Sequence, residues 1–327
     1  MTKQAKITTQ LVNSSSNYHI PVLLNECLEN LNIKENGIYV DATMGGGGHS
    51  SNILNRISSS GHLYCFDQDI EAIKECNIRF KDIDKNKFDI IHSNFSNMKE
   101  ELAKFNVTGV DGILFDLGVS SHQLDTQDRG FSYNYDARLD MRMDQRQKLS
   151  AYEVVNNYSE QDLVKIFFEY GEEKFSKSIA HHIVEERKQQ PINTTFELVE
   201  IIKRSVPAKY KNEKGHPAKR VFQAIRIEVN HELTILKDSL RNALELLNKN
   251  GRLCVITFHS LEDKIVKSLF KEVSEGPKWN RNMPIDLNEK ELDYKLVQRK
   301  AIVATEEELD YNNRSHSAKL RVIEKIR

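Results

Sequence analysis

The sequence predicts an α/β fold in which helices cover both faces of a mostly parallel sheet. Short apolar segments alternate with segments of helical periodicity from residue 37 onward. The connections between them are short, which favours parallel strands joined by helices. Three of the apolar segments end in an aspartate, namely Asp41, Asp67 and Asp116. Ligands of such sheets bind at the carboxyl ends of the strands, so this edge is the expected site.

The first part of the chain carries four strand segments and four helical segments. The strands are expected at 37–41, 62–67, 88–92 and 110–117, and the helices at 21–31, 49–57, 70–80 and 98–105. The strand segments are short apolar runs, whereas the helical segments place apolar residues three and four positions apart. Asp69 directly precedes one of these helices and is a candidate N-cap.

This alternation stops after residue 125. Residues 125–146 are polar and highly charged, 150–190 have the spacing of two or more helices, and 218–247 form one long helical run. Thr194 and Glu197 form a capping box ahead of a helix at 196–205. The last elements are expected to be a strand at 251–258, a helix at 264–273 that Ser260 caps, and extended segments at 295–304 and 318–326.

The change in pattern predicts an α/β core interrupted by an all-helical insertion. We expect a disordered tail at 1–17, the first part of the core at 18–125, the insertion at 126–232 and the second part of the core at 233–327.

Composition excludes several protein classes. The 327 residues are 39% hydrophobic and 29% charged, with a mean hydropathy of −0.56, which is typical of a globular protein. No segment approaches the ~18 apolar residues of a membrane span, and residues 1–17 lack the apolar core of a secretory signal. The four cysteines are scattered and form no metal-ligand spacing, so we expect reduced thiols, a cytoplasmic protein and no metal.

The formal net charge of −1 means that any affinity for nucleic acid must come from a local patch. One candidate is the basic stretch, residues 203–226, with eight Lys and Arg against one acid, a local charge of +7. Such a stretch fits phosphate contacts, although a solvated helix face would give the same pattern.

The glycine run Gly45–Gly48 between a strand and a helix is the first chemical signal. Glycine lets a nucleotide-like cofactor approach the backbone closely, although a flexible turn would look the same. No Gly-Lys-Ser/Thr follows, which excludes a P-loop.

Asp67 ends the next strand, where an acid can accept hydrogen bonds from both ribose hydroxyls of NAD or of S-adenosylmethionine. Phe95 follows the third strand and either lies against an adenine or packs in the core.

Asp116 ends the fourth strand, the position at which amino-methyltransferases present the target amine to the methyl donor. Methyl transfer needs the amine in line with the methyl group and water excluded. The carboxylate of Asp116 and the carbonyl of Leu117 would accept the hydrogens of the amine and help its nitrogen to pyramidalise, so Asp116 is the candidate catalytic residue. A loop-capping acid is the alternative for Asp116.

Ten segments, spread from about residue 19 toward the C-terminus, carry a family resemblance. They are 19–24, 41–50, 111–121, 123–125, 129–132, 139–144, 170–173, 216–218, 222–226 and 258–263. In combination they resemble the RsmH (MraW) family of ribosomal RNA small-subunit methyltransferases. The loop after Asp116 is not the Asp/Asn-Pro-Pro-aromatic loop of many amino-methyltransferases, so a chemical role of Asp116 stays a hypothesis.

The resemblance implies a Rossmann-like methyltransferase that uses S-adenosylmethionine to methylate the exocyclic amine (N4) of a cytosine in the decoding centre of 16S rRNA. The cofactor contacts that it implies fall on Gly47, Gly48, His49, Asp67, Phe95, Asp116 and Gln123. The partner would be 16S rRNA or the small ribosomal subunit, with the basic stretch of the insertion on phosphates. The oligomeric state stays open, a dimer included.

Three alternatives remain from the residues alone. An NAD-dependent oxidoreductase shares the glycine run and the ribose acid, a ribosome-assembly factor can keep this fold without turnover, and an amino-methyltransferase can act on DNA.

Further candidate residues are Arg138, Arg142 and Arg146, which either bind phosphates or pair with neighbouring aspartates. His259 is expected to line a base pocket, and Trp279 either stacks on a base or packs against the protein.

Overall fold

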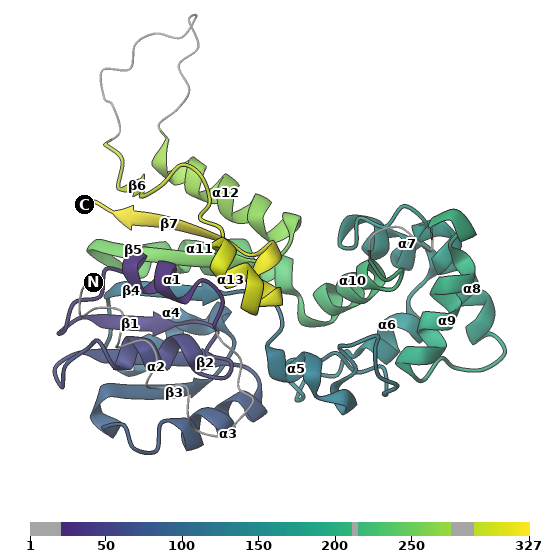
Figure 1. Cartoon of the computed structure of the whole chain (residues 1–327), viewed down its shortest axis with the longest axis horizontal. Coiled ribbons are helices and arrows are strands. Elements are labelled where there is room, and N and C mark those ends of the chain that lie inside the picture. The colour runs from purple at the N-terminus through teal and green to yellow at the C-terminus, as the bar shows by residue number, and fades with distance from the viewer. Residues whose placement is uncertain (1–20, 211–214, 276–290) are drawn as a thin grey trace, which may run out of the picture.

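The computed structural model describes residues 21–210, 215–275 and 291–327 (Figure 1). The expected tail at 1–17, residues 19 and 20 of the first family segment, and Trp279 lie outside the described residues.

A seven-stranded sheet forms the centre of the core, in the order β3-β2-β1-β4-β5-β7-β6. Its strands are β1 (Ile38–Asp41), β2 (His62–Asp67), β3 (Phe88–His92), β4 (Val110–Asp116), β5 (Leu247–Thr257), β6 (Tyr294–Leu296) and β7 (Lys319–Lys325). The first five pair in parallel, whereas β7 pairs antiparallel with both β5 and β6. The mostly parallel α/β fold predicted from the sequence is therefore confirmed.

Helices cover both faces of this sheet, and neighbouring strand residues alternate between the two hydrophobic layers. Leu63 and Cys65 pack with α1 (Leu24–Asn30), α2 (Gly48–Leu54) and α3 (Ile70–Arg79). Tyr64 and Phe66 pack on the opposite face with α4 (Met98–Lys104), α11 (Glu232–Leu246) and α12 (Ser260–Ser274). Both faces are buried, which explains why β2 is an almost continuous apolar segment in the sequence.

The helices between β4 and His231 belong to a part of the chain with its own hydrophobic cluster beside the sheet (Figure 1). They are α5 (Ser121–Asp125), α6 (Ala151–Asn157), α7 (Glu160–Glu169), α8 (Ser176–Arg187), α9 (Thr195–Ser205) and α10 (Lys219–Asn230). The buried side chains of this cluster run from Phe131 to Val229. The capping box of Thr194 and Glu197 is present as predicted. We keep the division at residues 126 and 232 as a proposal.

The single helix predicted at 218–247 is wrong, because the chain bends at His231. This residue has a left-handed backbone (φ 53°) and separates α10 from α11. The side chain of Asn230 accepts a hydrogen bond from the Met143 amide at 2.8 Å and donates one to the Met141 carbonyl at 2.8 Å. These distant contacts hold the bend, so that α10 packs in the insertion and α11 packs on the sheet.

Two other expectations at the C-terminal end need correction. The extended segment expected at 295–304 is a strand only at β6, and Ile302 forms an isolated bridge to Leu320. The helix α13 (Glu306–Tyr311) was not predicted. Ser260 does not cap α12: His259 is the N-cap residue, and the Ser260 hydroxyl donates to Glu172 Oε2 at 2.8 Å.

All four cysteines are buried free thiols, as expected. In the described parts of the chain, no helix combines the length and the apolar character that crossing a membrane requires.

Candidate active site

A cavity of about 620 Å³ opens at the carboxyl ends of β1, β2 and β4 and extends to α10 of the insertion. Six of the seven cofactor residues implied by the resemblance line it. They are Gly48, His49, Asp67, Phe95, Asp116 and Gln123. A volume of this size suits a small-molecule ligand. The parallel sheet brings these residues together because their strands end at one edge.

Gly47, the seventh, does not line the cavity. It lies where the glycine run packs against Cys76 and Phe80. Its backbone is left-handed (φ 74°), and a Cβ atom there would lie 2.8 Å from Cys76 Sγ and 2.8 Å from Phe80 Cζ. Only glycine therefore fits without displacing buried side chains of α3 and of the residue that follows it. Gly47 also serves as the N-cap residue of α2, so its conformation sets the direction in which the helix leaves the loop.

Asp67 ties the glycine run to the end of β2. Its Oδ2 accepts the Gly45 amide at 2.8 Å and its Oδ1 accepts the Asp69 amide at 2.8 Å. Burial is the main cause that raises the pKa of Asp67 to about 7. A carboxylate oxygen has two lone pairs, so each oxygen retains acceptor capacity for a further donor such as a ribose hydroxyl.

Asp116 and His49 form a close pair deeper in the cavity, with His49 Nδ1 3.6 Å from Asp116 Oδ2. The ring of His49 is buried and its Nε2 lies 3.1 Å from the Val22 carbonyl, which assigns the proton to Nε2. Burial lowers the pKa of His49 to about 4, so the ring is neutral at pH 7.

Asp116 itself is the least satisfied acid of the site. Its Oδ1 is buried without a hydrogen-bond partner among the described residues. Burial, followed by the nearby charges of Asp41 and Glu262, raises the pKa of Asp116 to about 8. An unpaired buried oxygen costs about 1–3 kcal/mol, which a ligand that donates a hydrogen bond would recover.

Gln123 and Phe95 contribute to the cavity wall in different ways. Gln123 completes a capping box with Ser120, and its Nε2 donates to Asp69 Oδ2 at 2.8 Å. Its amide is therefore held in place through Asp69, which caps α3 as expected. The ring of Phe95 packs edge-on against Phe115, with centroids 5.3 Å apart, and its side chain is only partly buried. Phe95 thus makes a core contact and also lines the cavity, and its place against an adenine stays a prediction.

Sequence reasoning missed Arg129, a buried side chain that joins the cavity to the insertion. Its Nη1 lies 2.9 Å from Asp69 Oδ2, and its Nη2 donates to the Arg142 carbonyl at 2.8 Å. The only signal for it was its place in the family segment 129–132, because nothing in its spacing relates it to Asp69.

The other basic candidates divide between ion pairs and the cavity. Arg142 pairs with Asp140 at 2.7 Å and Arg146 with Asp144 at 2.8 Å, in agreement with the ion-pair alternative for these two. Within the basic stretch, Arg226 is largely buried in an ion pair with Glu232 at 2.8 Å, whereas Lys219 lines the cavity. Arg226 and Lys219 therefore do not share one free surface, and Lys211 and Lys214 of the basic stretch lie outside the described residues.

His259 lines the cavity, and its role in a base pocket stays a prediction. It also belongs to a group that the sequence did not show. Glu232, His259 and Glu262 each contribute one polar atom to a cluster in which these atoms lie within 4.8 Å of one another. Glu232 is the first residue of α11, whereas His259 is the N-cap residue of α12. No local sequence motif therefore joins them.

Comparison with known proteins identifies the relatives of this chain. The Ribosomal RNA small subunit methyltransferase H of Streptococcus dysgalactiae subsp. equisimilis is 55% identical over 313 residues, which cover 95% of this chain and 98% of that protein.

Solved structures give more distant matches. An rRNA methylase from Streptococcus thermophilus is 11% identical with a TM-score of 0.41, over 95% of this chain and 100% of that one. A SAM-dependent O-methyltransferase from Thermotoga maritima is 9% identical with a TM-score of 0.41, over 96% and 68%. Likeness at this level carries no argument here.

A family profile also matches the chain. The profile described as the MraW methylase family matches residues 16–326, nearly the whole chain, and includes both parts of the core and the helical insertion. This match and the 55% identity to the streptococcal methyltransferase agree with the resemblance found in the sequence. The protein is a member of the MraW methylase family.

Proposed function

We propose that this methylase transfers a methyl group from S-adenosylmethionine to N4 of a cytosine in the decoding centre of 16S rRNA. The observation that carries the proposal is one cavity in which the unsatisfied carboxyl of Asp116 meets five other residues that the resemblance implies as cofactor contacts. The name of the streptococcal relative, a small-subunit rRNA methyltransferase, supports the class of substrate.

The residues present fit this cofactor. Asp67 offers acceptor lone pairs at the end of β2 for ribose hydroxyls, and Phe95 offers an aromatic wall. Asp116 offers a buried oxygen that lacks a donor. When bound, S-adenosylmethionine supplies an electrophilic methyl group on a positively charged sulfur.

Asp116 is proposed as the residue that engages the target amine. In the protein alone, its raised pKa of about 8 keeps much of this carboxyl protonated at pH 7. Opposite charge nearby favours the ionised form, so the carboxylate is expected to form once the cationic donor is bound. It then accepts a hydrogen from the amine and holds the nitrogen for in-line attack.

The helical insertion is proposed to orient the RNA. Lys219 and Gln223 of α10 line the same cavity as Asp67 and Asp116, so the insertion forms part of the cavity wall. A flipped or single-stranded cytosine would enter between the insertion and the core, and basic side chains of the insertion would contact phosphates.

Labelled methyl transfer tests the proposal. S-adenosylmethionine is offered with small subunits that lack the modification, with naked 16S rRNA and with duplex DNA, and the label is mapped by nuclease digestion and mass spectrometry. We expect one N4-methylated cytosine in an rRNA sample. Label in DNA alone would support the DNA alternative, and cofactor binding without transfer to any sample would support the assembly-factor alternative.

The Asp116→Asn variant tests the role of the carboxyl, with Asp89→Asn as the matched control. Asp89 is also a strand aspartate, but it pairs with His62 at 2.9 Å and does not line the cavity. We expect Asp116→Asn to lose turnover, whereas Asp89→Asn keeps it. Normal turnover with normal cofactor affinity in Asp116→Asn would contradict the catalytic role.

A further inference from the structure

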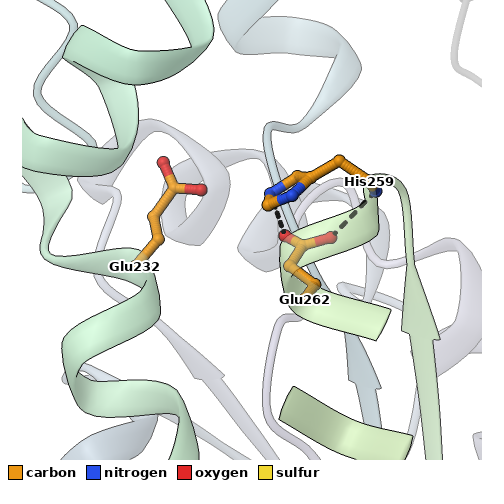
Figure 2. Close-up of side chains that lie close together, drawn as sticks. All are labelled: Glu232, His259 and Glu262. Carbon is orange, nitrogen blue, oxygen red and sulfur yellow. Dashed lines mark hydrogen bonds and ion pairs between the residues drawn. The ribbon is translucent and has the colours of Figure 1, made fainter. Parts of the chain in front are cut away.

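The cluster of Glu232, His259 and Glu262 lies in the cavity wall beside the methyl-transfer residues. Glu232 is the first residue of α11, His259 is the N-cap residue of α12, and Glu262 lies in the first turn of α12. Figure 2 shows the carboxylate of Glu232 and the ring of His259 turned toward each other, with Glu262 below the ring. One atom from each residue lies within 4.8 Å of the other two.

His259 is the unusual member of this cluster. Its side chain is 10% exposed, and both ring nitrogens are buried without a hydrogen-bond partner among the described residues. Its Nε2 faces Glu262 Oε1 at 3.1 Å, a contact that Figure 2 marks with a dashed line. Buried polar nitrogens normally have a hydrogen-bond partner, so a ligand at this ring would satisfy nitrogens that the described residues leave without one.

The two carboxylates are already oriented by other groups. Glu262 Oε2 accepts the backbone amides of Phe258 at 2.8 Å and His259 at 3.3 Å, which leaves Oε1 beside the ring. Arg226 donates from Nε and Nη2 to the two oxygens of Glu232, each at 2.8 Å. Each of these oxygens keeps a second lone pair. Hydrogen-bonded support of this kind is typical of the outer shell around ligands of a metal.

Distance and charge favour a cation over a neutral ligand in the centre of the cluster. Metal bonds to nitrogen and oxygen are about 2.0–2.3 Å long, which places neighbouring ligand atoms about 3.0–3.4 Å apart. The separation of 3.1 Å between His259 Nε2 and Glu262 Oε1 falls in this range. Two carboxylates against the one guanidinium of Arg226 leave a net negative charge.

We propose that Glu232, His259 and Glu262 bind one divalent transition-metal ion in the wall of the cavity. An imidazole with two carboxylates suits Mn²⁺, Co²⁺ or Zn²⁺ better than Mg²⁺ or Ca²⁺, which prefer oxygen ligands alone. The ion links the start of α11 to the start of α12, and through Arg226 to the insertion. No spacing in the sequence predicted it, because Glu232 and His259 are far apart in the chain.

Metal titration of the full-length, tag-free protein tests this proposal without RNA or S-adenosylmethionine. Its failure therefore leaves the proposed methyl transfer untouched. The protein is stripped with a chelator and titrated with Co²⁺, followed by visible absorption, and with Mn²⁺, followed by pulsed electron paramagnetic resonance. We expect one tight equivalent of metal and a nitrogen coupling to bound Mn²⁺ from the imidazole.

Variants locate the site. His259→Ala is expected to abolish the nitrogen coupling and to weaken binding at least about tenfold, and Glu232→Gln to weaken it while the coupling remains. His181→Ala is the matched control, because His181 also faces a glutamate, Glu160, at 3.6 Å but is exposed. Circular dichroism confirms that each variant is folded. No stoichiometric binding, or binding that both variants leave unchanged, would overturn the proposal.

Discussion

Replacement of Gly47 by alanine should damage the protein more than the same change at Gly45 in the same loop. Both glycines have left-handed backbones, with φ 74° at Gly47 and φ 50° at Gly45. An L residue in this conformation costs about 1–2 kcal/mol, and this cost applies to both variants. They differ in the space around the new methyl group.

At Gly47 the new Cβ would lie 2.8 Å from Cys76 Sγ, whereas at Gly45 the nearest atom is 3.9 Å away. Cys76 is fully buried, so it has little room to move. Overpacking of this kind costs about 1–3 kcal/mol. We therefore expect Gly47→Ala to lower the free energy of unfolding by about 2–5 kcal/mol and Gly45→Ala by about 1–2 kcal/mol.

Urea unfolding followed by circular dichroism measures both values, and calorimetry with S-adenosylhomocysteine measures the cofactor site. Any effect of the substitution on the unfolded chain is common to both variants and cancels in the difference. Equal loss of stability in the two variants would refute the steric reasoning. In that case the left-handed backbone, rather than contact with α3, would explain the glycine at position 47.

Three further predictions concern the acids of the cavity and their partners. Asp67→Asn should weaken S-adenosylhomocysteine binding about 10–100-fold in calorimetry, because a charge-assisted acceptor is lost, and unchanged affinity would count against the ribose role. Asp116 binds its proton more tightly in the folded state, with a pKa of about 8, than in the unfolded chain. Its stabilising effect is therefore present at low pH and is lost as the pH rises toward 8, by up to about 1.4 kcal/mol per pH unit. Urea unfolding at pH 5 and pH 8 should show a smaller loss in Asp116→Asn than in the wild type, because Asp67, with a pKa of about 7, contributes a loss in both proteins. An equal loss in the two proteins would disprove it. Arg129→Met should cost about 3–5 kcal/mol of unfolding free energy, because it removes the buried cation that pairs with the Asp69 carboxylate and leaves that charge with neutral hydrogen-bond donors alone. A loss below about 1 kcal/mol in the same assay would contradict the importance of this pair.

The elements that the sequence predicted well are those whose pattern is local. The bounds of β2 and β3 agree with the prediction to the residue, because each is a short apolar run between polar connections. The bend at His231 was missed because no glycine or proline marks it. Its cause is the pair of hydrogen bonds from Asn230 to residues of another segment, which no window of sequence contains.

The same division holds for the site. Asp67 and Asp116 could be predicted because a parallel sheet brings the ends of its strands to one edge, whatever the loops do. Arg129 and the cluster around His259 could not, because their partners are assembled by the docking of the insertion and by two helix starts that lie far apart in the chain.

Buried polar contacts connect Asp67 at the end of β2 to the bend at His231 without interruption. Asp67 accepts the amide of Asp69, and the carboxylate of Asp69 pairs with Arg129. The guanidinium of Arg129 then donates to the carbonyls of Arg142 and Met143, and the Met143 amide donates to Asn230 at the end of α10. A buried network of this kind is costly when any member is left unpaired. The position of the insertion and the shape of the cavity around Asp67 therefore depend on the same residues, so a change that loosens one is expected to loosen the other.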